Sequence, residues 1–173
     1  MQFNMESTVK LHSLKVVELK SYTFALLFVA GNIILPQLCH LIPMGGMILL
    51  PIYFFTLIAA YKYGFVTGLL TAMASPLINH ALFGMPATEM LPIILIKSAL
   101  LAAAAAYMAQ RTKEIKIQNI LAVILIYQGI GMMAEFALTG SFVAAMQDIR
   151  LGFPGMLLQL VGGFFCLKAI SKW

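Results

Sequence analysis

The chain alternates between long apolar runs and short polar segments. Six such runs occur, and most of them are about 18 residues or longer. A helix of that length crosses the ~30 Å hydrocarbon core of a bilayer. The pattern therefore predicts an all-α integral membrane protein, a single membrane domain over residues 1–173, with spans at 21–42, 47–60, 65–83, 90–110, 117–139 and 153–170.

Three features predict local irregularity. Residues 47–60 would cover only about 21 Å as a helix, so we expect this span to be tilted or irregular and shielded by its neighbours. We expect Pro36 to kink the first span and Pro76 to interrupt the third, because proline lacks the N–H that a helix interior requires. Residues 1–19 mix lysines with apolar residues, which predicts either a short interfacial helix or a frayed tail.

The distribution of basic residues predicts the orientation of the spans. Cytoplasmic loops are enriched in Lys and Arg. If both termini are cytoplasmic, nine of the eleven basic residues fall on the inner side, whereas Lys97 lies within a span and Arg150 in an outer loop. We therefore predict a multi-pass membrane protein with cytoplasmic termini. The inner basic residues are Lys10, Lys15, Lys20, Lys62, Arg111, Lys113, Lys116, Lys168 and Lys172.

Composition excludes several classes of protein. Hydrophobic residues make up 62% of the chain and charged residues 10%, against about 25% charged residues in soluble domains. The net charge of +5 does not indicate nucleic-acid binding, because the basic residues flank apolar runs and form no patch. Hydrolase, zinc-protease and ATP-binding signatures are absent. Cys39 and Cys166 lie at opposite predicted faces, without a further Cys/His cluster. We expect no enzyme activity, no metal and no cofactor.

One ammonium group and one carboxylate lie inside predicted spans. Under the predicted topology, Lys97 falls in the outer third of the fourth span and Glu135 near the outer end of the fifth. Consecutive antiparallel spans are usually neighbours, so we expect these two side chains to pair in the empty protein. A charge at this depth costs about 3 kcal/mol or more unless it is paired or reaches water. Lys97 either snorkels to the interface or faces a polar pocket.

Further polar residues fall in the same outer half. So many buried polar groups at one face predict a water-filled cavity that opens outward and binds a small molecule. Structural alternatives remain: His80 can bond a carbonyl freed by Pro76, Gln128 can join helices, and Lys97 and Glu135 can form a purely structural pair. The candidate substrate-binding residues are Lys97, Glu135, Arg150, Asn79, His80, Gln128, Gln159 and His40.

Several short motifs occur in a fixed order along the second, third and last predicted spans. Leu50-Pro51 opens the second span, Lys62-Tyr63-Gly64 forms a turn, residues 68–77 run from a glycine through Ser-Pro-Leu, and Gly84-Met85-Pro86 ends the third span. The last span carries Pro154, Gly155 and Gln159. In order and spacing these motifs resemble the substrate-binding S component of energy-coupling factor (ECF) vitamin transporters, of the folate, pantothenate or hydroxymethylpyrimidine type.

The resemblance implies a six-helix bundle that binds a vitamin or precursor near the outer face. It implies a complex with a transmembrane T component and two ATPase subunits, which import the ligand. It also implies a location in the inner (plasma) membrane of a prokaryotic cell. Many S components carry small residues four positions apart in span one, where they dock on the T component. This chain departs from that pattern, because Val29 follows Ala25 at this spacing. We therefore expect the docking surface to include the small residues Ala30, Gly68, Ala103 and Ala104.

The identity of the ligand and one alternative class remain open. Lys97 and Arg150 favour an anion such as a carboxylate, whereas Glu135 and His80 leave room for a ring-nitrogen donor. The alternative function is a non-transporting membrane scaffold similar to the rod-shape protein MreD. A scaffold binds no ligand and tolerates the loss of Lys97.

Overall fold

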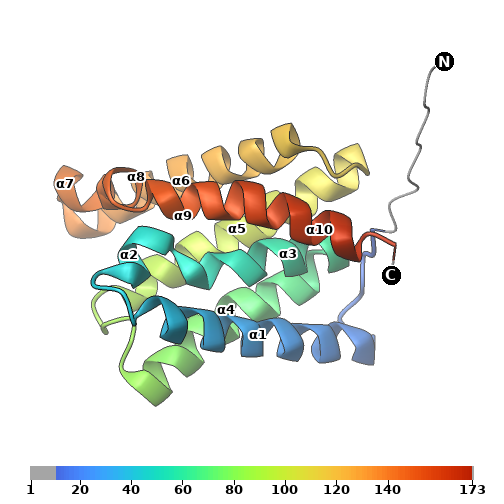
Figure 1. Cartoon of the computed structure of the whole chain (residues 1–173), viewed down its shortest axis with the longest axis horizontal. Helices are drawn as coiled ribbons and strands as arrows, with labels where there is room; N and C mark the ends of the chain where they lie inside the picture. The colour runs from blue at the N-terminus through green and yellow to red at the C-terminus, as the bar shows by residue number, and fades with distance from the viewer. Residues whose placement is uncertain (1–10, 173) are drawn as a thin grey trace.

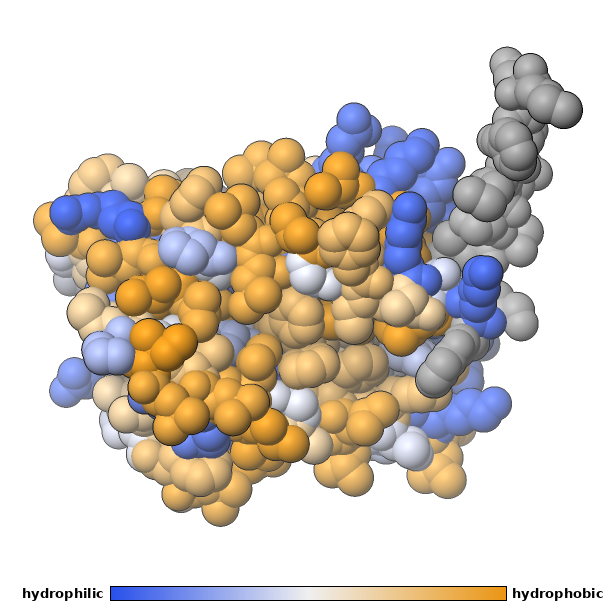
Figure 2. Space-filling view, viewed as in Figure 1, coloured by the Kyte–Doolittle hydropathy of each residue, from blue (hydrophilic) through white to orange (hydrophobic). Residues whose placement is uncertain are grey.

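The computed structural model describes residues 11–172, and no strand occurs among them. Five helical stretches are long and apolar enough to cross a membrane, which fits the predicted all-α, multi-pass membrane protein. Apolar side chains cover most of the face in Figure 2, and hydrophilic ones gather mainly toward one end. The five stretches are α1 (Leu19–Cys39), α4 (Phe65–Phe83), α5 (Leu91–Thr112), α6 (Ile117–Thr139) and the stretch Phe153–Ile170.

The remaining elements are short. The stretch at 153–170 consists of α9 (Phe153–Leu157), the π-helical segment η2 (Leu158–Gly162) and α10 (Gly163–Ile170). Two four-residue helices, α7 (Phe142–Ala145) and α8 (Gln147–Arg150), connect α6 to α9. The segment predicted as the second span is broken into α2 (Gly45–Leu49), the 3₁₀ turn η1 (Pro51–Tyr53) and α3 (Phe54–Tyr63).

Helix α3 forms the centre of the bundle. It packs against α1, α4, α5 and α10 (Figure 1), and every residue from 56 to 63 is buried. The chain breaks before α3 because Leu50 has a left-handed backbone with φ of 46° and Pro51 follows it. The backbone groups freed by this break need shielding from lipid, which the surrounding helices supply. The predicted irregular and shielded second segment is therefore confirmed.

Glycine 68 sets the distance between α3 and α4. A Cβ atom at Gly68 would lie 2.4 Å from Cβ and 2.7 Å from Cα of Ala60. Such contacts are far shorter than van der Waals distance, so the two helices approach closely because position 68 has no side chain. Small residues commonly allow close packing of helices in lipid.

The long helices differ from prediction at one proline and at some of their ends. Helix α1 ends at Cys39 rather than at residue 42. The expected interruption at Pro76 is wrong, because α4 continues through this residue to Phe83. Proline is tolerated inside membrane helices when neighbouring groups satisfy the freed backbone. Nearby, Asn79 donates from Nδ2 to the Ser75 carbonyl at 2.9 Å.

Backbone contacts bring the predicted inner segments together at one end of the bundle. His12 N donates to Lys62 O at 2.8 Å, and Leu14 N donates to Tyr63 O at 3.1 Å. Residues 11–18 contain no helix, and residues 1–10 of the predicted interfacial segment lie outside the described residues. Lys62 is fully buried and donates to Ser171 O at 3.2 Å, so it is not the loop residue that was predicted.

Candidate functional site

Three charged side chains meet near the opposite end of the bundle. Lys97 Nζ lies 2.5 Å from Oε2 of Glu135 and 2.8 Å from Oδ2 of Asp148. Lys97 and Glu135 are buried, whereas the Asp148 side chain keeps 19% of its surface exposed. The predicted Lys97–Glu135 pair is therefore confirmed, and Asp148 on α8 is a second partner. We call these three residues the charged triad.

The side chain of Lys97 reaches the carboxylates across Gly131 of α6. A Cβ atom at Gly131 would lie 2.7 Å from Cγ of Lys97, so the absence of a side chain leaves room for the lysine stem. Gly131 and Glu135 lie one helical turn apart on the same face of α6. Because Lys97 is only 2% exposed, the snorkelling interpretation is wrong.

Aromatic and amide side chains form hydrogen bonds below the triad. Tyr127 Oη donates to Oε1 of Gln159 at 2.9 Å and accepts from Nε2 of Gln128 at 3.1 Å. The rings of Tyr53 and Tyr127 pack with their centroids 5.5 Å apart. We call Tyr53, Tyr127, Gln128 and Gln159 the second layer. Gln128 lies two turns from Glu135, roughly 10 Å along α6.

Gln159 has an unused hydrogen-bond donor. Its side chain is fully buried, and Nε2 has no partner among residues 11–172. The residue belongs to the π-helical segment η2, and π-helical turns occur frequently at functional sites. A buried donor without a partner costs about 1–3 kcal/mol. A ligand with a suitable acceptor would remove this cost.

Another predicted site residue, Asn79, belongs to a separate network between α1, α3 and α4. Asn32 Nδ2 donates to Oγ1 of Thr56 at 3.0 Å and to Oγ of Ser75 at 3.2 Å. Asn79 Nδ2 donates to the Asn32 carbonyl at 2.9 Å. These groups satisfy one another, so the network has the character of a structural link between helices. Asn79 therefore forms its hydrogen bonds with this network and not with the triad.

The remaining predicted site residues lie away from the triad's contacts. His40 is exposed and adjoins Gly46, and Arg150 is exposed on α8. His80 Nδ1 lies 2.7 Å from Pro86 O, which joins the end of α4 to the following turn instead of to a carbonyl near Pro76. Lys97, Glu135, Gln128 and Gln159 are all buried, so the predicted open, water-filled cavity is not present around them.

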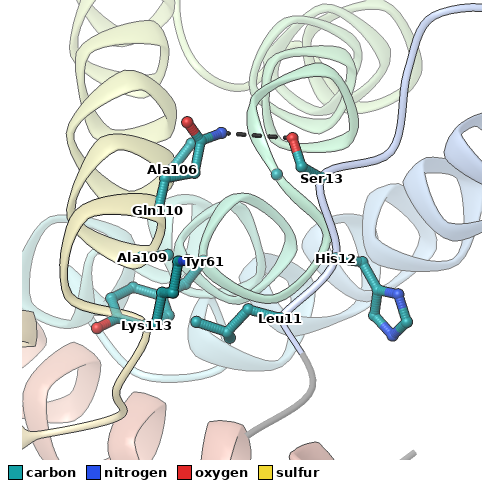
Figure 3. Close-up of a pocket in the computed structure, with 9 residues that line it drawn as sticks. Leu11, His12, Ser13, Tyr61, Ala106, Ala109, Gln110 and Lys113 are labelled. Atoms are coloured by element: carbon teal, nitrogen blue, oxygen red, sulfur yellow. Dashed lines mark hydrogen bonds between the residues drawn. The ribbon is translucent and has the colours of Figure 1, made fainter.

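A cavity of about 390 Å³ lies at the other end of the bundle. Figure 3 shows the residues that line it, among them Gln110, whose Nε2 donates to Oγ of Ser13 at 3.5 Å. Its walls come from residues 11–13 and the ends of α3 and α5. The cavity shares no residue with the charged triad or with the second layer, so it is not part of the predicted ligand site.

The predicted docking residues differ in accessibility. Ala30 and Ala103 are exposed, and Ala104 is half-buried. Gly68 is buried against the backbone of α3, so it does not lie on an outer surface and its role is internal packing. The expectation of a partner contact at Gly68 is therefore replaced by a role in the α3–α4 contact.

The arrangement can recognise charge and hydrogen-bonding groups. Within residues 11–172, no group of three or more His, Cys, Asp or Glu side chains is placed to hold a metal ion. The triad instead combines a positive group with two negative ones, and Gln159 supplies an unused amide donor in the second layer. Comparisons with protein-family models, with curated proteins and with solved structures found no match to this chain.

Sequence reasoning did not select Asp148, which belongs to the charged triad, or Tyr53 and Tyr127, which belong to the second layer. Asp148 is the only acidic residue between α6 and α9, at the membrane face predicted for Lys97, and this signal could have identified it. Tyr53 and Tyr127 carried no comparable signal, because tyrosines in apolar runs are common and their meeting depends on the fold.

Proposed function

We propose that this chain is the substrate-binding subunit of an ECF-type importer that captures a small organic molecule beside the charged triad. The buried ammonium group of Lys97, held by two carboxylates under a short helix, is the observation that carries the proposal. The sequence resemblance to S components supplies the transport class. The two lines of support are independent, because the triad depends on side-chain geometry and the resemblance on motif order.

A purely structural role explains the triad less well. Buried ion pairs are weak contributors to stability, because desolvation offsets the attraction between the charges. Here two carboxylates meet one ammonium group, so the triad carries a surplus negative charge. Elsewhere among the predicted site residues, Gln159 has an unused donor. A ligand that replaces one of the two carboxylates on Lys97, or that satisfies the Gln159 donor, would account for these features in a binding site.

The proposed topology has six spans with both termini inside. Backbone contacts place residues 12–14 beside residues 62 and 63, and Lys62 beside Ser171. The chain therefore leaves the basic end along α1 and returns to it along the α2–α3 segment. It leaves again along α4 and returns along α5, then leaves along α6 and returns along the stretch 153–170. We propose that the α2–α3 segment acts as the sixth span, shielded from lipid by its neighbours. The basic end then faces the cytoplasm and the triad faces outward.

Cysteine labelling tests this orientation. With Cys39 and Cys166 replaced by alanine, Ala87→Cys should react with a membrane-impermeant maleimide in intact cells, because this exposed loop residue lies on the proposed outer side. Gln118→Cys, exposed near the basic end, should react only after the cells are permeabilised. Labelling of Gln118→Cys in intact cells would contradict the proposed topology.

The proposed partners are a T component and two ATPase subunits, because the chain carries no ATP-binding motif. A partner in the membrane would contact exposed small residues that allow close approach, and Ala30 and Ala103 fit this requirement.

Mass spectrometry of co-purifying small molecules tests the proposed function. The matched control is a charge-free variant that combines Lys97→Met, Glu135→Gln and Asp148→Asn. A compound should be enriched in extracts of the wild-type protein and missing from extracts of this variant. If the two folded proteins release the same compounds, the triad does not bind a ligand. That result would favour the alternative of a scaffold similar to MreD.

A further inference from the structure

We propose that Asp148 occupies the anion position of the site in the ligand-free protein, and that a ligand carboxylate takes its place on Lys97. This inference rests on the proposed function for the existence of a ligand. It narrows the ligand class to organic carboxylates and assigns a selective role to Asp148. It also predicts that residues 146–151 are released from Lys97 when such a ligand binds.

Asp148 is the member of the triad that can exchange most readily. Its side chain is 19% exposed, against 3% for Glu135, so Asp148 can move into water while Glu135 cannot. Glu135 belongs to the 23-residue helix α6, whereas Asp148 belongs to the four-residue helix α8. An exchange at Glu135 would require a long packed helix to move.

Few specific contacts hold α8 in place. No residue of α8 is buried, and the helix has no side-chain cap at its N-terminus. Among the described residues, two side-chain bonds join α8 to other helices. One is the charged Asp148–Lys97 bond, and the other runs from Gln147 Nε2 to Met47 Sδ at 3.0 Å. The preceding helix α7 is anchored by buried Ala145, so the movement is confined to residues after 145.

Charge balance explains why a carboxylate would displace Asp148. The triad carries one positive and two negative charges, and exchange of one carboxylate for another leaves this sum unchanged. A neutral ligand would leave Lys97 with one carboxylate fewer to accept its hydrogen bonds. A cationic ligand would be repelled by the ammonium group at this position. Asp148 therefore selects for ligands that carry an equivalent anionic group.

Hydrogen exchange measured by mass spectrometry tests the inference on the full-length protein. Asp148→Asn removes the charge of the tether and keeps the neutral Lys97–Glu135 pair. We expect amide exchange at residues 146–151 to accelerate about tenfold or more without any added compound. Glu89→Gln is the matched control, since Glu89 is an exposed carboxylate outside the site, and it should exchange like the wild type. Asp148→Glu keeps the charge and should remain close to the wild type.

Three probes of similar shape then test the ligand class. Benzoate at millimolar concentration should accelerate exchange at residues 146–151 in the wild type and cause no further acceleration in Asp148→Asn. Benzoate should also bind Asp148→Asn at least about tenfold more tightly than the wild type, because the internal competitor is absent. Neutral benzamide and cationic benzylamine should have neither effect.

Several outcomes would overturn the inference. Asp148→Asn that melts cooperatively but exchanges like the wild type would show that the tether does not hold α8. Release of α8 without benzoate binding to either protein would show that Asp148 does not mark an anion position. Stronger effects of benzylamine than of benzoate would reverse the assigned ligand charge. These outcomes are distinct from failure of the proposed function, which the mass-spectrometry experiment tests. If a compound co-purifies with the wild type and not with the charge-free variant, the proposed function stands even when this inference fails. If no such compound is found, the proposed function itself fails.

Discussion

Lys97→Met is expected to destabilise the protein by about 3–5 kcal/mol, because it leaves Glu135 and Asp148 without their cation. Both carboxylates accept a hydrogen bond from Lys97 Nζ, and Glu135 is almost fully buried. Methionine preserves most of the length of the stem beside Gly131, so the loss reflects charge more than packing. The free energy of unfolding, measured in detergent micelles, is the observable.

Two control variants separate charge from packing in this experiment. The charge-free variant should recover most of the lost stability, since a buried ion group replaced by neutral groups of similar shape is often no less stable. Lys116→Met removes an exposed ammonium group near the basic end and should change stability by about 1 kcal/mol at most. If Lys97→Met were as stable as Lys116→Met, the triad would contribute nothing to the fold.

The same substitution is expected to weaken ligand binding. Once a co-purifying compound is identified, Lys97→Met should raise its Kd by roughly 30-fold to several thousand-fold, because loss of one partner of a desolvated charged contact costs about 2–5 kcal/mol. The charge-free variant should bind equally poorly although it is stable. Calorimetry that gave Kd values within about threefold of wild type, or roughly 0.7 kcal/mol, would exclude Lys97 from the binding site.

Gly68→Ala is expected to destabilise the bundle by about 1–3 kcal/mol or more, because the added methyl group meets the backbone of α3. The close atoms at Ala60 include Cα, so no side-chain rotation relieves the contact. Gly129→Ala is the matched control. A Cβ atom there meets nothing within 4 Å, and alanine is favoured over glycine in a helix by about 0.5–1 kcal/mol.

Thermal melting of the two glycine variants distinguishes internal packing from partner docking. Gly68→Ala should lower the Tm of the isolated protein, and Gly129→Ala should leave it unchanged or raise it. Gly68→Ala that melted like the wild type but failed to assemble with a T component would restore the original expectation that Gly68 contacts a partner.

The predictions from the sequence agree best with the structure where hydrophobicity alone determines the extent of a helix. The boundaries of α4 and α6 equal the predicted 65–83 and 117–139, because each helix has to satisfy its own backbone within lipid. The pairing of Lys97 with Glu135 was predictable as well, since unpaired charges at that depth are costly and consecutive spans are neighbours.

The same reasoning failed where a residue's surroundings decide its role. Lys62 follows an apolar run and reads as a loop cation, but it is buried beside Ser171, which is distant in the sequence. Gly68 belongs to a small-residue stripe, and the stripe alone does not distinguish contact with α3 from contact with a partner. Pro76 remains within a continuous helix because neighbouring helices shield the freed backbone.

The sequence by itself determined the long apolar helices, the segregation of basic residues and the pairing of two intramembrane charges, because these follow from the cost of placing polar groups in lipid. The tertiary structure alone decided that Asp148 joins Lys97, that Tyr53 packs against Tyr127, and that Asn79 belongs to another network. Such contacts depend on helix rotation and on the path of short connecting helices, which hydrophobic periodicity does not specify. The selective role proposed for Asp148 therefore emerges only from the folded chain.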